Sequence, residues 1–120
     1  MSTIPPQMRP TIDRFAEGMG LVASPQRDGS VSFVFERSGR LTFTPADDGE
    51  RVVMSLTRPS QRAPQDILSR AGYEPVLDLV VSAGMTRTGA AVFAIAFDEE
   101  RFELSDIDRG FRHLLAAFEG

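Results

Sequence analysis

The chain has 120 residues, a net charge of −4 at pH 7 and no cysteine. A chain of this length forms one domain, and the lack of cysteine excludes disulfides, thiolate zinc sites and cysteine nucleophiles. An acidic chain without a basic stripe is also a poor nucleic-acid binder, because phosphate neutralisation supplies most of that affinity.

Neither a membrane span nor a signal peptide is expected. The most apolar stretch, residues 76–97, is interrupted by a polar turn, whereas a helix that spans a bilayer needs about 20 consecutive apolar residues. The first ten residues lack the basic and apolar regions of a signal peptide. We therefore expect a cytoplasmic protein with no membrane partner.

The N-terminal part of the chain predicts a short arm and then a helix. Residues 1–7 are polar with two prolines, which favours a flexible arm. A helix is predicted to begin near Arg9, because Pro10 is tolerated only in a first turn, and to end at Gly18 to Gly20. Its apolar residues recur with helical spacing and form one stripe, which comprises Met8, Ile12, Phe15, Ala16 and Met19.

Three consecutive strands are predicted next. Ser30–Glu36, Leu41–Thr44 and Arg51–Thr57 each alternate apolar and polar residues. The turn signals Ser38-Gly39 and Asp47–Glu50 separate them. Short turns between alternating strands indicate an antiparallel meander with one solvated face.

A second helix, a hairpin and a third helix complete the chain. The second helix begins at Pro64, ends at Gly72 and has few apolar residues, so packing must stabilise it. The hairpin strands, Val76–Ala83 and Ala90–Phe97, are apolar on both faces. The last helix begins with a capping box formed by Ser105 and Asp108 and has a strong apolar stripe, which comprises Ile107, Phe111, Leu114, Leu115 and Phe118.

The fold class that follows is α+β. Residues 1–120 are predicted to form a single domain in the order α-β-β-β-α-β-β-α, with a twisted, mostly antiparallel five-stranded sheet packed against helices. The helices can cover one face of the sheet, which leaves surplus apolar area, and such area usually marks an interaction surface.

Residues that could carry chemistry are few. The only histidine, His113, lies beside the apolar stripe of the last helix and is interpreted as structural. The carboxylates of Asp47, Asp48 and Glu50 suit a tight turn better than a calcium loop, and residues 98–100 are interpreted as a solvated charge run. The sequence therefore predicts no catalytic residue, no metal site and no cofactor.

The hydrophobic layout resembles that of the small acidic chaperones of type III secretion effectors, the CesT/SycE-like class. The resemblance covers nearly the whole chain and has no invariant motif. Pro75, which cuts the second helix, departs from the family pattern. The stretches that carry the resemblance are Phe15–Leu21, Asp28–Phe33, Leu41–Thr44, Val52–Leu56 and Phe102–Phe118.

This resemblance implies an ATP-independent chaperone. Such a protein forms a homodimer, binds an extended N-terminal segment of a secreted effector and keeps it soluble and competent for export. The family's dimer interface involves the second helix and the fourth strand, which here implies Ile67, Leu68, Leu77, Leu79 and Val81. The effector lies over apolar patches near the first helix and adjoining strands, which here implies Met8, Ile12, Phe15, Met19 and Val34.

Two alternatives stand beside this interpretation. The chain could be a chaperone-like interaction or regulatory module that is not tied to secretion, with the same fold and the same apolar surfaces. It could also be a small α+β domain that binds a small molecule in a concave pocket with convergent polar groups, for which polar candidates are scarce in this sequence.

Overall fold

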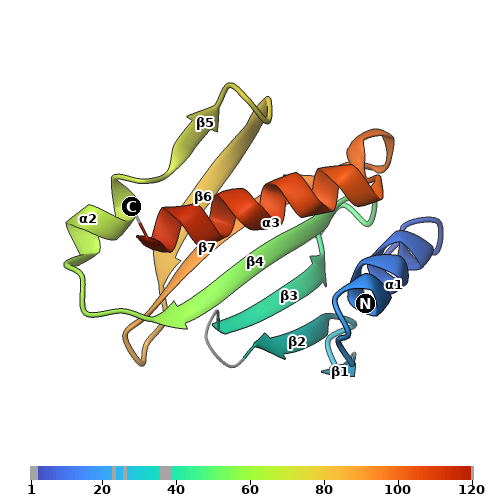
Figure 1. The fold of residues 1–120 in the computed structure, drawn as a ribbon, viewed down its shortest axis with the longest axis horizontal. Coiled ribbons are helices and arrows are strands. Elements are labelled where there is room, and N and C mark those ends of the chain that lie inside the picture. Colours follow the sequence, from blue (N-terminus) through green and yellow to red (C-terminus); the bar gives the residue numbers. More distant parts are fainter. Residues whose placement is uncertain (1–2, 23, 26, 36–38, 120) are drawn as a thin grey trace.

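The fold is a seven-stranded sheet with helices on one face (Figure 1). The computed structural model of the protein describes residues 3–22, 24–25, 27–35 and 39–119. The helices are α1 (Arg9–Gly18), α2 (Pro64–Leu68), the 3-10 helix η1 (Glu99–Arg101) and α3 (Leu104–Glu119). The strands are β1 (Ser24–Pro25), β2 (Val31–Phe35), β3 (Gly39–Pro45), β4 (Val52–Pro59), β5 (Gly72–Glu74), β6 (Leu79–Met85) and β7 (Ala90–Phe97).

The strands lie in the order β1-β2-β3-β4-β7-β6-β5, and all pairs among the described residues are antiparallel. The prediction of five strands was wrong, because β1 and β5 add one strand at each edge. β1 has two residues and β5 has three, so neither is long enough to show an alternating pattern. Such short strands arise from pairing with a neighbour rather than from local sequence.

The first strand of the predicted hairpin begins later than expected. Val76–Ala83 was predicted, whereas β6 begins at Leu79 and ends at Met85. A turn precedes β6, in which the amide of Asp78 donates to the carbonyl of Glu74 at 2.8 Å. Asp78 has a φ of 53°, in the left-handed region, which Asp tolerates better than most residues. Glu36 and Ser38, predicted in a strand end and a turn, lie outside the described residues.

The core lies between one face of the sheet and the helices α1 and α3. Cross-strand registers align the inward residues in rows, one of which comprises Val31, Phe43, Met54, Ile95 and Val81, all buried. α3 approaches the sheet closely at Gly110, where an added Cβ atom would lie 3.0 Å from the side chains of Met54 and Phe97. α1 packs beside α3 through Phe15 and Phe111, whose ring centroids are 5.7 Å apart.

The opposite face of the sheet has no helix over it among the described residues (Figure 1). The register brings small and hydroxyl-bearing residues together in one row on this open face, which comprises Ser32, Thr42, Ser55, Ala94 and Ser82. The predicted meander with one solvated face therefore matches the observed sheet.

The two ends of the chain pack around this core. Within the predicted arm, Ile4 is 4% exposed and belongs to the core, and the amide of Met8 donates to the Pro5 carbonyl at 2.9 Å. The capping interaction at the start of α3 differs from the predicted pair Ser105 and Asp108. A carboxylate oxygen of Asp106 instead accepts from the amide of Glu103 at 2.9 Å, and α3 begins at Leu104.

Candidate functional site

The large apolar side chains that remain exposed lie toward the two ends of the sheet. Near α1 and β2 these are Met19, Val22, Val34 and Leu104. At the other end a second set, called here the β5 edge patch, comprises Leu68, Tyr73, Val76 and Val80. Exposed apolar side chains that gather in this way are typical of interaction surfaces. The two sets are far apart, because α1 and β5 lie at opposite ends of the molecule (Figure 1).

An apolar hollow of about 530 Å³, called here the α1–α3 hollow, lies between the end of α1 and the start of α3. Its apolar lining comes from Phe15 in α1, from Met19 directly after α1 and from Leu104 in α3. Gly18 also lines the hollow and leaves space in it, because an added Cβ atom would meet nothing within 4 Å. The polar groups around the hollow belong to Arg14, Ser105 and Asp108.

The structure brings together two of the five residues predicted to contact an effector. Phe15 and Met19 both line the α1–α3 hollow, and Met19 is 45% exposed. Met8 and Ile12 belong to the same helical stripe but are buried in the core. Val34 is 67% exposed and lies on the open face of the sheet, with its Cα atom paired to that of Arg40.

Sequence reasoning missed Leu104 and Gly18 as parts of this hollow. Leu104 is the first residue of α3 and lies three positions before Ile107, so the helical spacing of the apolar stripe extends to it and could have found it. Gly18 was interpreted only as a helix end. The signal that could have found it is the absence of a side chain between two apolar residues, Phe15 and Met19, on one helix face.

The residues predicted for a dimer interface lie at the β5 end of the sheet, at different depths. Ile67 and Val81 are buried within the chain, and Leu77 and Leu79 are half-buried against the core. Leu68 is exposed and belongs to the β5 edge patch. The sequence did not predict the other three members of the patch, because they depend on β5. Tyr73 in β5 pairs with Val80 in β6, and Val76 lies in the turn between these strands.

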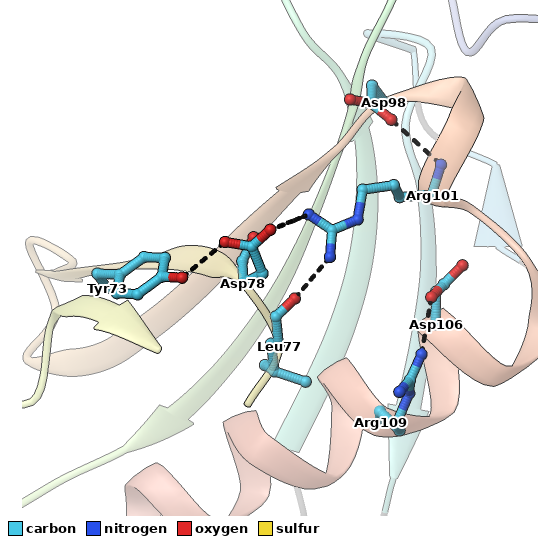
Figure 2. A network of polar contacts seen from close by, with 7 residues as sticks. All are labelled: Tyr73, Leu77, Asp78, Asp98, Arg101, Asp106 and Arg109. Carbon is cyan, nitrogen blue, oxygen red and sulfur yellow. Dashed lines mark hydrogen bonds and ion pairs between the residues drawn. The ribbon is translucent and has the colours of Figure 1, made fainter. Parts of the chain in front are cut away.

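A polar network holds the turn between β5 and β6 against η1 (Figure 2). The Tyr73 hydroxyl donates to Oδ1 of Asp78 at 2.6 Å. Arg101 donates from Nη1 to the Asp78 carbonyl and from Nη2 to the Leu77 carbonyl, at 2.9 Å each. The Arg101 backbone is itself fixed, because its amide donates to Oδ1 of Asp98 at 3.1 Å. The turn, and with it β5, is thus fastened to the end of β7.

This network lowers the pKa of one of its side chains and raises the pKa of another. The hydrogen bond from Tyr73 and the nearby Arg101 guanidinium hold the pKa of Asp78 below its usual value. The same hydrogen bond raises the pKa of Tyr73, because the phenol must stay protonated to donate it. Both effects favour the pair of a neutral phenol and a charged carboxylate near neutral pH.

The side chains considered for catalysis or metal binding occupy structural positions. His113 is half-buried on α3, with Nε2 3.9 Å from a carboxylate oxygen of Glu74. Asp48 accepts hydrogen bonds from the amides of Glu50 and Arg51 at 2.9 and 3.1 Å, as a turn residue does. Among the described residues, no group of three or more His, Asp or Glu side chains is placed to hold a metal ion.

Comparison with solved structures decides which fold this is. No protein-family model and no curated protein matches the sequence. A chain in the structure of the HopA1-SchA chaperone-effector complex matches with a TM-score of 0.70 and 17% identity, over 95% of this chain and 91% of that chain. The chain has the fold of a type III secretion chaperone. The resemblance drawn from the hydrophobic layout is therefore confirmed for the fold.

A second structure of this kind matches nearly as well. It is the Yersinia pestis type III secretion chaperone SycH in complex with a stable fragment of YscM2, with a TM-score of 0.66 and 12% identity. The match covers 91% of this chain and 94% of that chain. No helix in the described part of this type III secretion chaperone fold is long and apolar enough to cross a membrane.

Proposed function

We propose that this protein is a cytoplasmic, ATP-independent chaperone of type III secretion. In this role it binds an extended N-terminal segment of an exported effector and keeps that segment soluble and competent for export. The observation that carries the proposal is the α1–α3 hollow: an open, mostly apolar site on a fold shared with secretion chaperones. No catalytic role is proposed for any residue.

The hollow suits an apolar side chain of an unfolded segment. Met19 is flexible and adapts to varied partners, whereas Phe15 is fixed by edge contacts with Phe43 and Phe111. Burial of one large apolar side chain contributes about 1.5–3 kcal/mol. Arg14 is positively charged and Asp108 is negatively charged, and both can form hydrogen bonds with the backbone of a bound segment. Because their charges are opposite, the hollow does not favour segments of one net charge.

A bound segment can also extend the sheet at β2. Among the described residues, β1 pairs only with Val31 and Ser32, so β2 continues beyond its partner from Phe33 to Phe35. Strand addition to such an edge uses backbone hydrogen bonds and therefore accepts many sequences. A chaperone that binds an unfolded segment needs this tolerance.

We further propose that the protein acts as a homodimer through the β5 edge patch. Leu68, Tyr73, Val76 and Val80 supply exposed apolar contacts, whereas Leu77 and Leu79 are half-buried and Ile67 and Val81 are buried in the core. A stable dimer buries about 1,600 Å² in total, so the interface must extend beyond these side chains along the end of the sheet and α2. The patch leaves the α1–α3 hollow free, because β5 and α1 lie at opposite ends of the molecule (Figure 1) and no residue belongs to both surfaces.

The test needs an exported effector as the partner, and candidates are exported proteins with a disordered N-terminal segment that are encoded near this chain. The effector's N-terminal segment is co-produced with the chaperone, and light scattering after gel filtration gives mass and stoichiometry. We expect a complex of two chaperone copies with one segment that has no tertiary structure of its own by NMR. Met19→Asp should abolish the complex, whereas Gln61→Asp, which adds the same charge at an exposed site in the β4–α2 connection, should not.

A second measurement, export of the partner by cells with and without this chain, separates secretion from a general interaction role. Loss of the chain should reduce export of the partner if the protein is a secretion chaperone. A complex that forms normally while export is unchanged would instead support an interaction or regulatory module that is not tied to secretion.

A further inference from the structure

A second, polar hollow lies on the open face of the sheet, away from the α1–α3 hollow. It measures about 590 Å³ and is called here the β2–β3 hollow. Ser32 in β2 and Thr42 in β3, which belong to the hydroxyl row of the open face, form part of its lining. The remaining lining residues come from the turn before β2 and from the start of β3, and they are Arg27, Asp28, Ser30 and Arg40.

The floor of the β2–β3 hollow is held in place by short hydrogen bonds. Oδ1 of Asp28 accepts from the amide of Ser30 at 3.0 Å and from its hydroxyl at 2.6 Å. Gly29 permits this turn with a φ of 87°. The hydroxyls of Ser32 and Thr42 are 3.0 Å apart and hydrogen-bonded. Ser30 and Ser32 are both buried, so the hydroxyl floor is part of the folded structure.

The two arginines of this hollow differ from most others in the protein. Six described arginines form ion pairs with aspartates of the chain: Arg51, Arg62, Arg70, Arg101, Arg109 and Arg112. Within the described residues, Arg27 and Arg40 have neither an ion pair nor a hydrogen bond from their guanidinium groups. Two free cations therefore line one hollow of a protein whose net charge is −4.

Asp28 offsets only one of these two positive charges. Its carboxylate is already engaged by Ser30, and these hydrogen bonds hold its pKa below the usual value, so it stays charged. The charges that line the hollow thus sum to +1, from two guanidinium groups and one carboxylate. A guanidinium binds a carboxylate through two parallel N–H groups. In the Ser32–Thr42 pair one hydroxyl donates to the other, so the second keeps its proton and can donate to the same carboxylate.

We propose that the β2–β3 hollow binds one carboxylate side chain of the polypeptide that the protein carries. This inference rests on the proposed function, because it assigns the ligand to the same bound segment. Val34 lies next to the hollow on the open face, two residues from Ser32 and paired with Arg40. In an extended segment, side chains on one face recur at every second residue. The segment therefore carries an acidic residue two positions from an apolar one.

The test uses a small probe, so that it does not depend on the identity of the effector. N-acetyl-glutamate N-methylamide is titrated into the ¹⁵N-labelled protein at low salt, with the glutamine analogue as the matched neutral probe. We expect saturable amide shifts for Ser30, Ser32 and Thr42 with the glutamate probe alone. Arg27→Gln and Arg40→Gln should each weaken the titration roughly tenfold, as expected for a lost charge-assisted hydrogen bond.

Arg87→Gln is the control, since it removes an exposed arginine in the β6–β7 turn and should leave the titration unchanged. The spectrum of each variant reports its folding, and Arg27 lies in a surface turn where a glutamine is tolerated even if Arg40→Gln unfolds. Equal shifts with both probes, no saturable shift, or unchanged shifts in both arginine variants would overturn the proposal. Inorganic phosphate that shifts these amides where glutamate does not would overturn the assignment to a carboxylate. None of these outcomes affects the effector complex, whose failure would instead count against the proposed function.

Discussion

Arg101 and Asp78 join the end of the sheet that carries β5 to the loop after β7. Nη1 of Arg101 lies 3.3 Å from Oδ2 of Asp78 and 2.9 Å from the Asp78 carbonyl oxygen (Figure 2). The two residues are 23 positions apart in the sequence. Asp78 has a left-handed backbone conformation in the turn directly before β6, so this contact holds the turn that joins β6 to β5, the edge strand of the proposed dimer surface.

The first prediction concerns the pH dependence of this contact. The folded-state pKa of Asp78 is lowered by the Tyr73 hydroxyl and by Arg101, relative to its ordinary value of 3.8. A carboxylate whose pKa is lower in the folded state than in the unfolded state stabilises the fold at pH values above its unfolded-state pKa. This contribution is lost as the pH falls through the folded-state pKa. Asp78→Asn should therefore be less stable than the natural protein near neutral pH, and the difference should vanish in acid below the folded-state pKa.

Urea unfolding at about pH 7 and at the lowest pH at which the protein still folds measures this difference. Asparagine tolerates the left-handed conformation, so the substitution tests the charge and not the backbone. Asp13→Asn, on the exposed side of α1, is the control and should not change stability at either pH. A constant deficit of Asp78→Asn at both pH values would contradict the prediction.

The second prediction concerns the space at Gly18. Gly18→Leu should fill the α1–α3 hollow, since an added Cβ atom there meets nothing within 4 Å. A leucine is also a better helix former than glycine by about 0.5–1 kcal/mol, so the fold should be as stable as before or more so. Gel filtration with the effector segment should show a complex that is lost in Gly18→Leu and retained in Gly18→Ala. Full binding by Gly18→Leu would exclude the hollow as the binding site.

The third prediction concerns the dimer. Val80→Asp places a charge in the β5 edge patch, where Val80 is 61% exposed, so its effect on the stability of the single chain should be within about 0.5 kcal/mol. The variant should sediment as a monomer at micromolar concentration, whereas the natural protein should sediment as a dimer. Ser82→Asp, on the same strand and the same face but outside the patch, is the matched control. If the Val80→Asp protein is still a dimer, the interface does not lie at the β5 edge patch.

The fourth prediction concerns the close packing of α3 on the sheet. Gly110→Val should cost about 1–3 kcal/mol by overpacking, because even the first added carbon lies 3.0 Å from Met54 and Phe97. Gly18→Val is the matched control, with the same substitution in a helix and open space around it. Thermal unfolding of both variants measures the difference. An equal effect at the two glycines would show that helix propensity, and not contact with the sheet, decides the cost.

The sequence by itself determined those parts of the fold in which local pattern and burial agree. In β4, Val52, Met54 and Leu56 alternate with polar or smaller residues, and all three are buried. In the stripe of α3, Ile107, Phe111, Leu114 and Phe118 are buried as well, and Leu115 is half-buried. These elements are long enough for their period to show which face is apolar, and the hydrophobic effect turns that face inward whatever the rest of the chain does.

Tertiary structure alone decided the edges of the sheet and the position of the sites. β1 and β5 are too short to carry a pattern, and they exist because β2 and β6 offer free backbone groups to pair with. Met8 and Met19 lie on one helical stripe, yet Met8 is buried and Met19 lines an open hollow. The reason is that a stripe shows which side of a helix faces the protein. It does not show where the neighbouring helix begins. Because α3 begins at Leu104, its cover of α1 ends there and leaves Met19 open to the hollow.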